Sequence, residues 1–128
     1  MNHLRAVVLG LGLGKQRALG YIQNEDVELC AVCDINSERV KNFLEENPKV
    51  SGYKDYQTMV EKEKPDIVNV STPDWMHLKH AQIALEHGCH VLLEKPMVRK
   101  ITEAEELIKT VEESGKTLMV GQNYRRTP

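Results

Sequence analysis

Short runs of apolar, often β-branched residues alternate along the chain with longer stretches in which apolar residues recur at helical spacing. The short runs predict strands over residues 4–10, 27–34, 65–72, 89–96 and 116–124, with a further short strand near 49–53. The longer stretches predict helices from the glycine-rich segment to about residue 24, and over 36–46, 55–63, 74–88 and 102–115. This alternation is typical of an α/β fold with a parallel sheet.

Right-handed crossovers between consecutive strands place helices on both faces of such a sheet. We therefore predict a doubly wound, three-layer αβα (Rossmann) fold with strand order 3-2-1-4-5-6. The length of 128 residues and the hydrophobic content of 41% suit one domain over residues 1–128. Ligands of such sheets bind outside the carboxyl ends of the strands, so the loops to inspect are "GLGLGK", "CDIN", "STPDWMH" and "EKP".

The charge pattern argues against nucleic acid and membrane as partners. Lys and Arg number 17 and Asp and Glu 19, for a formal net charge of −2, and the two signs are interspersed. No apolar run approaches the roughly 20 residues that span a bilayer, and we find no export signal, so we expect a cytoplasmic protein.

The cysteines are expected to be buried, reduced thiols. Cys30 and Cys33 form a C-x-x-C, but it falls in a predicted strand, where residues three apart point to opposite faces. With Cys89 the count is odd, which argues against a disulfide framework. A redox or metal site is the alternative, and we expect no metal.

The glycine loop follows a strand and opens a helix, where backbone N–H groups can hold a pyrophosphate. A strict G-x-G-x-x-G from Gly10 and Gly12 would need glycine or alanine at position 15, where Lys15 stands. A turn shorter by one residue gives Gly14 the third role, which is packing the helix on the sheet, and puts Lys15 near the phosphates. A plain strand-to-helix turn is the alternative interpretation.

Asp34 ends the second predicted strand about 20 residues after the loop, where a carboxylate accepts hydrogen bonds from the adenosine ribose. It would repel a 2′-phosphate, so NAD is favoured over NADP, with Arg39 one helical turn further as a reservation. The alternative is a turn residue at a strand end.

In "STPDWMH", Pro73 fixes the backbone between Thr72 and the next helix, and His77 lies in the first turn of that helix, on the cofactor side. A surface or capping histidine is the alternative. His80 and His87 are interpreted as solvated helix positions.

In "EKP", Pro96 keeps Lys95 out of the helical region at the ligand edge, and a cis Lys95–Pro96 bond is compatible with this segment. The lysine there can donate to a substrate hydroxyl or take its proton. The alternative is an exposed Glu–Lys pair before a turn.

Together, "STPDWMH", "ALEHGCHVLLEKPMVRKITEAEEL" and "GKTLMVGQNYRRTP" resemble the amino-terminal NAD(P)-binding Rossmann domain of the Gfo/Idh/MocA oxidoreductases, over essentially the whole chain. The resemblance implies that Lys95 is the catalytic residue. It also implies a cofactor-binding set of Gly10, Gly12, Leu13, Gly14, Asp34, Ser71, Thr72, Pro73, His77, Glu94, Lys95 and Pro96. In that family an α+β domain that binds substrate and forms the main oligomer contact follows this point, and we expect it to be missing here.

The resemblance therefore implies the NAD-binding part of a homo-oligomeric oxidoreductase that moves hydride between a nicotinamide cofactor and a hydroxyl carbon of a sugar or polyol. We expect the domain alone to be inactive, with an exposed apolar patch near Tyr124. A non-catalytic NAD(H)-binding or sensing module is the first alternative. A methyl or nucleotide transferase on the same fold is the second, which the E-K-P segment disfavours.

Overall fold

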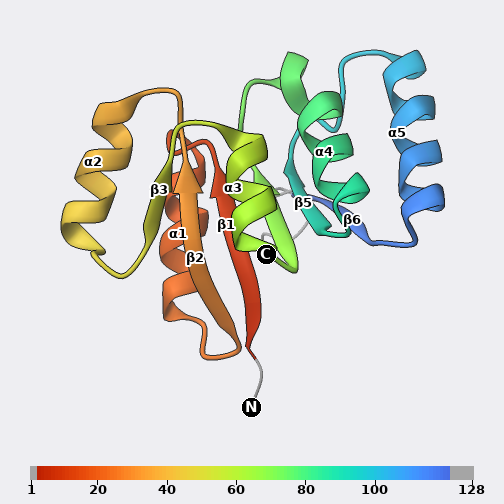
Figure 1. Ribbon diagram of the computed structural model, residues 1–128. Coiled ribbons are helices and arrows are strands. Elements are labelled where there is room, and N and C mark those ends of the chain that lie inside the picture. The colour runs from red at the N-terminus through yellow and green to blue at the C-terminus, as the bar shows by residue number, and fades with distance from the viewer. Residues whose placement is uncertain (1–2, 122–128) are drawn as a thin grey trace, which may run out of the picture.

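The computed structural model describes residues 3–121, which form one parallel sheet with helices on both faces (Figure 1). The strands are β1 (Leu4–Leu9), β2 (Val27–Cys33), β3 (Ser51–Tyr53), β4 (Ile67–Val70), β5 (His90–Glu94) and β6 (Leu118–Gly121). The helices are α1 (Gly14–Gln23), α2 (Ser37–Glu46), α3 (Tyr56–Glu63), α4 (His77–Glu86) and α5 (Ile101–Ser114), with a 3₁₀ turn at Asp74–Met76.

The six strands are ordered β3-β2-β1-β4-β5-β6 and every neighbouring pair is parallel, which confirms the predicted doubly wound sheet. The elements match the predicted ones within a few residues. The main difference lies at residues 74–76, where the chain makes a 3₁₀ turn before α4 begins at His77. Leu118–Gly121 matches the predicted last strand, whereas the apolar patch expected near Tyr124 lies outside the described residues.

Two hydrophobic clusters fill the space on either side of the sheet. One packs α3, α4 and α5 against the sheet through buried side chains such as Met59, Leu85 and Leu107. The other packs α1 and α2 against it, with Ala18 and Phe43 at the centre. On this face of the sheet, α1 and α2 cover mainly β1, β2 and β3. A shallow apolar groove of about 400 Å³ lies over β5 and β6.

The three cysteines are free, buried thiols, as expected. Burial raises the pKa of Cys33 to about 12 and that of Cys89 to about 11. The prediction that Cys30 and Cys33 point to opposite faces is wrong, because both belong to the hydrophobic cluster that packs α3, α4 and α5 against the sheet. The register between β1 and β2 shifts there: Ala6 pairs with Leu29 and Val7 with Ala31, so Cys30 is an extra residue in a β-bulge.

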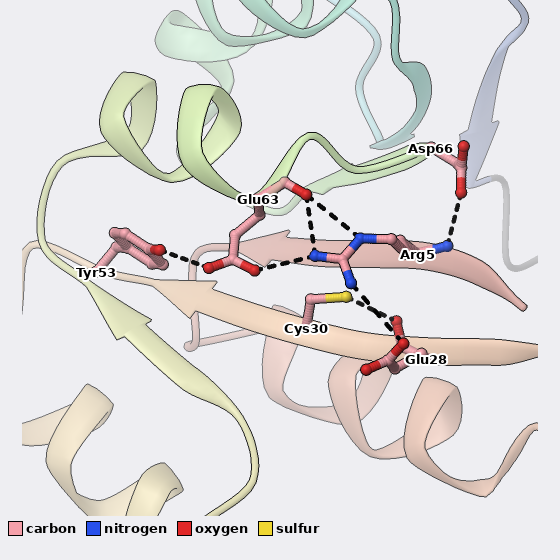
Figure 2. Close-up of polar contacts among 6 residues, drawn as sticks. All are labelled: Arg5, Glu28, Cys30, Tyr53, Glu63 and Asp66. Carbon is pink, nitrogen blue, oxygen red and sulfur yellow. Dashed lines mark hydrogen bonds and ion pairs between the residues drawn. The ribbon is translucent and has the colours of Figure 1, made fainter.

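A polar network ties the end of α3 to the amino ends of β1 and β2 (Figure 2). The Arg5 guanidinium donates to the Glu63 carbonyl oxygen at 3.0 Å and to the Glu63 carboxylate at 3.2 Å, and it lies 3.8 Å from Glu28. Tyr53 donates its hydroxyl to the other Glu63 oxygen, and the Arg5 backbone N–H donates to Asp66 at 2.8 Å. The network thus joins the end of α3 to β1 and β2 and, through Tyr53, to the carboxyl end of β3. No helix within residues 3–121 has the length and apolar character to cross a membrane.

Candidate functional site at the carboxyl edge of the sheet

The loops that follow β1, β2, β4 and β5 meet at one edge of the sheet and line two cavities that share Gly12 and Leu13. The larger has a volume of about 570 Å³ and is called here the Asp34 cavity. Besides the shared residues, its lining includes Gly10, Asp34, Ile35, Arg39, Ser71, Thr72, Pro73, Trp75, Met76 and His80. The second, called the Lys95 cavity, has a volume of about 520 Å³ and is completed by Gln16, Arg17, Glu94 and Lys95.

The glycine loop lies directly against Ser71 at the end of β4. Gly10 has φ +94°, and a Cβ there would lie 2.5 Å from the Ser71 carbonyl oxygen. A Cβ on Gly14 would lie 3.0 Å from both Ser71 Cβ and Val8 Cγ1. Gly14 is thus the point where α1 approaches the sheet, as the shortened-turn alignment predicts, and α1 starts with its amino end beside both cavities.

Asp34 is buried and braces the glycine loop. One carboxylate oxygen accepts the backbone N–H of Leu11 at 2.8 Å, and the other accepts that of Asn36 at 2.8 Å. Arg39 Nη1 lies 3.6 Å from the first of these oxygens, so the guanidinium offsets part of the negative charge. Carboxylate oxygens accept more than one hydrogen bond each, which leaves Asp34 capacity for a ligand hydroxyl at the cavity.

Two buried imidazoles, those of His77 and His80, lie in the first half of α4, close to Thr72. His80 Nδ1 lies 2.9 Å from Thr72 Oγ1, and the His80 ring makes an edge-on contact with Tyr56 at 5.0 Å between centroids. The prediction that His80 is solvated is therefore wrong: its side chain is buried in the wall of the Asp34 cavity. Burial, with smaller contributions from Lys79 and His77, lowers the pKa of His80 to about 4, so the ring is neutral at neutral pH.

His77 lies beneath the loops and does not line either cavity. It is 1% exposed, and its ring nitrogens face the carbonyl oxygens of Pro96 and Thr72. Pro96 is likewise outside both linings, and the Lys95–Pro96 peptide bond is cis. Within residues 3–121, three of the predicted site residues therefore lie outside the linings of both cavities: Gly14, His77 and Pro96.

The Lys95 cavity brings the end of β5 to the start of α1. Glu94 is held by Arg17 of α1, whose Nη2 lies 3.0 Å from one carboxylate oxygen and 3.1 Å from the other. The Glu94 side chain is only 12% exposed, so this pair joins α1 to β5 in a partly buried setting. Lys95 is exposed and faces the glycine loop across the cavity.

Several lining residues were not singled out from the sequence. Ile35, Trp75, Met76 and His80 line the Asp34 cavity, and Gln16 and Arg17 line the Lys95 cavity. Each of them lies within a few residues of a predicted position. Lys54, Asp55 and Tyr56 also line the Asp34 cavity, but they follow β3, whose loop was not among those singled out. The available signal was therefore proximity to the loops at the carboxyl edge.

The edge has the features that a dinucleotide requires. Two cavities flank the amino end of α1, where backbone N–H groups favour a pyrophosphate. The backbone of Gly10 packs on Ser71 and leaves no room for a side chain, so the glycine loop can lie directly against the end of β4. A buried carboxylate stands at the end of β2 and a lysine at the end of β5. These residues fit NAD.

Comparisons with known proteins agree with this geometry. Residues 4–122 match the family model described as "Oxidoreductase family, NAD-binding Rossmann fold" (GFO_IDH_MocA). The D-glucoside 3-dehydrogenase of Escherichia coli K12 is 36% identical over 124 residues, covering 95% of this chain and 35% of that protein. The myo-inositol 2-dehydrogenase of Lactobacillus plantarum superposes with TM-score 0.92 at 26% identity, covering 98% of this chain and 38% of the other.

A third relative was solved with its cofactor. The WlbA dehydrogenase of Chromobacterium violaceum, in complex with NADH and UDP-GlcNAcA, superposes with TM-score 0.90 at 27% identity, covering 98% of this chain and 37% of the other. This chain spans between a third and two fifths of the length of these three relatives. From the family match over nearly all its residues, the chain belongs to the Gfo/Idh/MocA oxidoreductase family and is its NAD-binding Rossmann domain.

Proposed function

We propose that this chain is the cofactor-binding part of a dehydrogenase that oxidises a hydroxyl group of a sugar or polyol, with Lys95 as its catalytic residue. The observation that carries the proposal is the placement of Lys95 across one cavity from the glycine loop. The names of the relatives, a glucoside and an inositol dehydrogenase among them, support the substrate class.

NAD supplies a hydride acceptor when bound, and the residues of this chain hold and orient it. The glycine loop and the amino end of α1 would bind the pyrophosphate, and the Asp34 carboxylate would accept hydrogen bonds from the ribose hydroxyls. The Asp34 carboxylate would also repel a 2′-phosphate, so we propose that NAD is preferred to NADP. Arg39 is already placed against Asp34, which limits its role as a phosphate partner.

Lys95 would act at the substrate hydroxyl, donating a hydrogen bond to it or taking its proton as the alcohol becomes a ketone. Glu94 would not take part directly, because Arg17 already holds its carboxylate. Its proposed role is to fix the end of β5, and thereby Lys95, relative to α1.

Two measurements test this function. Calorimetric titration of the domain with NADH and NADPH should show tighter binding of NADH, and equal affinity would refute the ribose role of Asp34. In the full-length protein, Lys95→Ala should lower kcat by at least about 100-fold with NADH affinity retained, as expected for loss of a general acid or base. The matched control is Lys100→Ala, an exposed lysine just before α5, which should keep full turnover.

A further inference from the structure

His77 occupies a position between the two halves of the site. It is the first residue of α4 and is 1% exposed. Its Nδ1 lies 2.8 Å from the carbonyl oxygen of Pro96, and its Nε2 lies 2.8 Å from that of Thr72. One imidazole ring therefore spans the gap between the loop after β5 and the loop after β4.

The chemistry of these contacts constrains the ring. A carbonyl oxygen only accepts hydrogen bonds, so both contacts are hydrogen bonds when both ring nitrogens carry hydrogen. Filling the same space with an apolar side chain would leave both carbonyl oxygens without any donor from this position, which is costly in a partly buried site. The neutral ring thus offers one N–H donor that can serve either carbonyl oxygen, and the ring with hydrogen on both nitrogens can serve both, in addition to packing volume.

Both loops have attachments besides His77. Thr72 has a second attachment through His80 at its hydroxyl, and the preceding Ser71 N–H donates to Leu9 at 2.8 Å within the sheet. The sheet ladder of β5 ends at Glu94, and the side chains of Met97 and Val98 then pack against the hydrophobic core. Pro96 lies two residues beyond Glu94 and contributes no N–H of its own.

We propose that His77 is a positioning residue that fixes the Lys95–Pro96 segment against Thr72, and so sets the spacing between the Lys95 cavity and the Asp34 cavity. This inference rests on the proposed function for the meaning of Lys95. The geometry that it assigns to the segment is independent of turnover.

The test is chemical rescue of His77→Gly in the ligand-free domain, followed by ¹⁵N relaxation of the backbone amides of Lys95 and Val98. In the wild type we expect order parameters of about 0.85 at both amides, falling below about 0.6 in the variant. Addition of 4-methylimidazole, which has the ring and both nitrogens of the lost side chain, should restore them. Its isomer 1-methylimidazole fills the same volume but has one nitrogen blocked, and it should not.

The controls separate positioning from packing. His87→Gly removes an exposed histidine just after the other end of the same helix and should leave the Lys95 amide unchanged. Equal rescue by both isomers would overturn the proposal, since packing alone would then explain the effect. An unchanged Lys95 amide in His77→Gly would overturn it as well.

If His77→Gly does not fold, His77→Gln provides the same test, because one amide nitrogen replaces the two ring nitrogens that face the Pro96 and Thr72 carbonyl oxygens. Raised mobility at Lys95 and Val98 supports the proposal, and wild-type order at both amides overturns it. Because no cofactor or substrate is present, a failure here is distinct from a failure of the proposed function, which depends on turnover and NADH affinity.

Discussion

The Asp34 carboxylate accepts the backbone N–H of Leu11 at 2.8 Å and so joins the end of β2 to the glycine loop. The other carboxylate oxygen is engaged by Asn36 at the start of the next turn. One side chain therefore holds the backbone of two loops that line the Asp34 cavity, the glycine loop and the loop after β2.

Replacing Asp34 by alanine should weaken both the loop and the cofactor site. Loss of two hydrogen bonds to a buried charged acceptor should lower the free energy of unfolding by about 1–3 kcal/mol and NADH affinity at least tenfold. Asp34→Asn should fall between, because the amide keeps a single accepting oxygen. Urea denaturation and calorimetry measure the two effects. Asp26→Asn, at an exposed carboxylate, should change neither, and wild-type NADH affinity in Asp34→Ala would contradict the assignment.

Alanine at Gly10 should be strongly destabilising, whereas alanine at Gly20 should not. Gly10 has φ +94° and its added Cβ would meet the Ser71 carbonyl oxygen at 2.5 Å. We expect Gly10→Ala to cost about 2–4 kcal/mol of stability and to abolish NADH binding. Gly20 lies in α1 with nothing within 4 Å of its Cβ position, so Gly20→Ala should stabilise the helix by up to about 1 kcal/mol. Equal effects in thermal unfolding would show that the loop is not so constrained.

Protonation of His80 should destabilise the fold in mild acid. Its folded pKa is about 4, against an ordinary value of 6.5, so between these values the unfolded chain binds a proton that the folded chain does not. The corresponding stability is complete above pH about 6.5 and is lost as the pH falls towards 4, on the order of 2 kcal/mol by pH 5.

Urea denaturation at pH 7 and pH 5 measures this loss in the wild type and in His80→Gln. The variant should be less stable at pH 7 and should show a shallower decline. His87→Gln should keep the wild-type slope. Identical slopes in the wild type and His80→Gln would show that His80 does not remain neutral.

Trp75 should report cofactor binding directly. It is the single tryptophan of the chain, it is 59% exposed, and it lines the Asp34 cavity. Binding of NADH should therefore quench its emission and transfer energy to the nicotinamide. A fluorescence titration should give the same dissociation constant as calorimetry. Unaltered emission at an NADH concentration that saturates by calorimetry would place the ligand elsewhere.

The strand order and the ligand edge could be predicted because parallel βαβ units leave few topologies once strands and helices alternate. That edge, the spacing after the glycine loop and the family resemblance together pointed to Asp34, Thr72 and Lys95. The backbone hydrogen bonds that Asp34 makes could not be predicted, since they depend on how closely the glycine loop passes β2.

His80 shows where the interpretation of the sequence failed. His80 was interpreted as a solvated helix position, yet it shares the buried side of α4 with His77, Ala84 and Leu85. The helical spacing of these residues therefore indicated that His80 is buried. The bulge at Cys30 had no such signal, because a register shift depends on the partner strand.

Ser71 stands behind both Gly10 and Gly14, with its carbonyl oxygen against one and its Cβ against the other. The glycine loop is thus shaped on a surface that lies some 60 residues away in the sequence. For protein engineering this makes residue 71 an inseparable part of the loop. A glycine loop transplanted into another scaffold, or recombined between homologues, needs a small residue at the end of the fourth strand to be transferred with it.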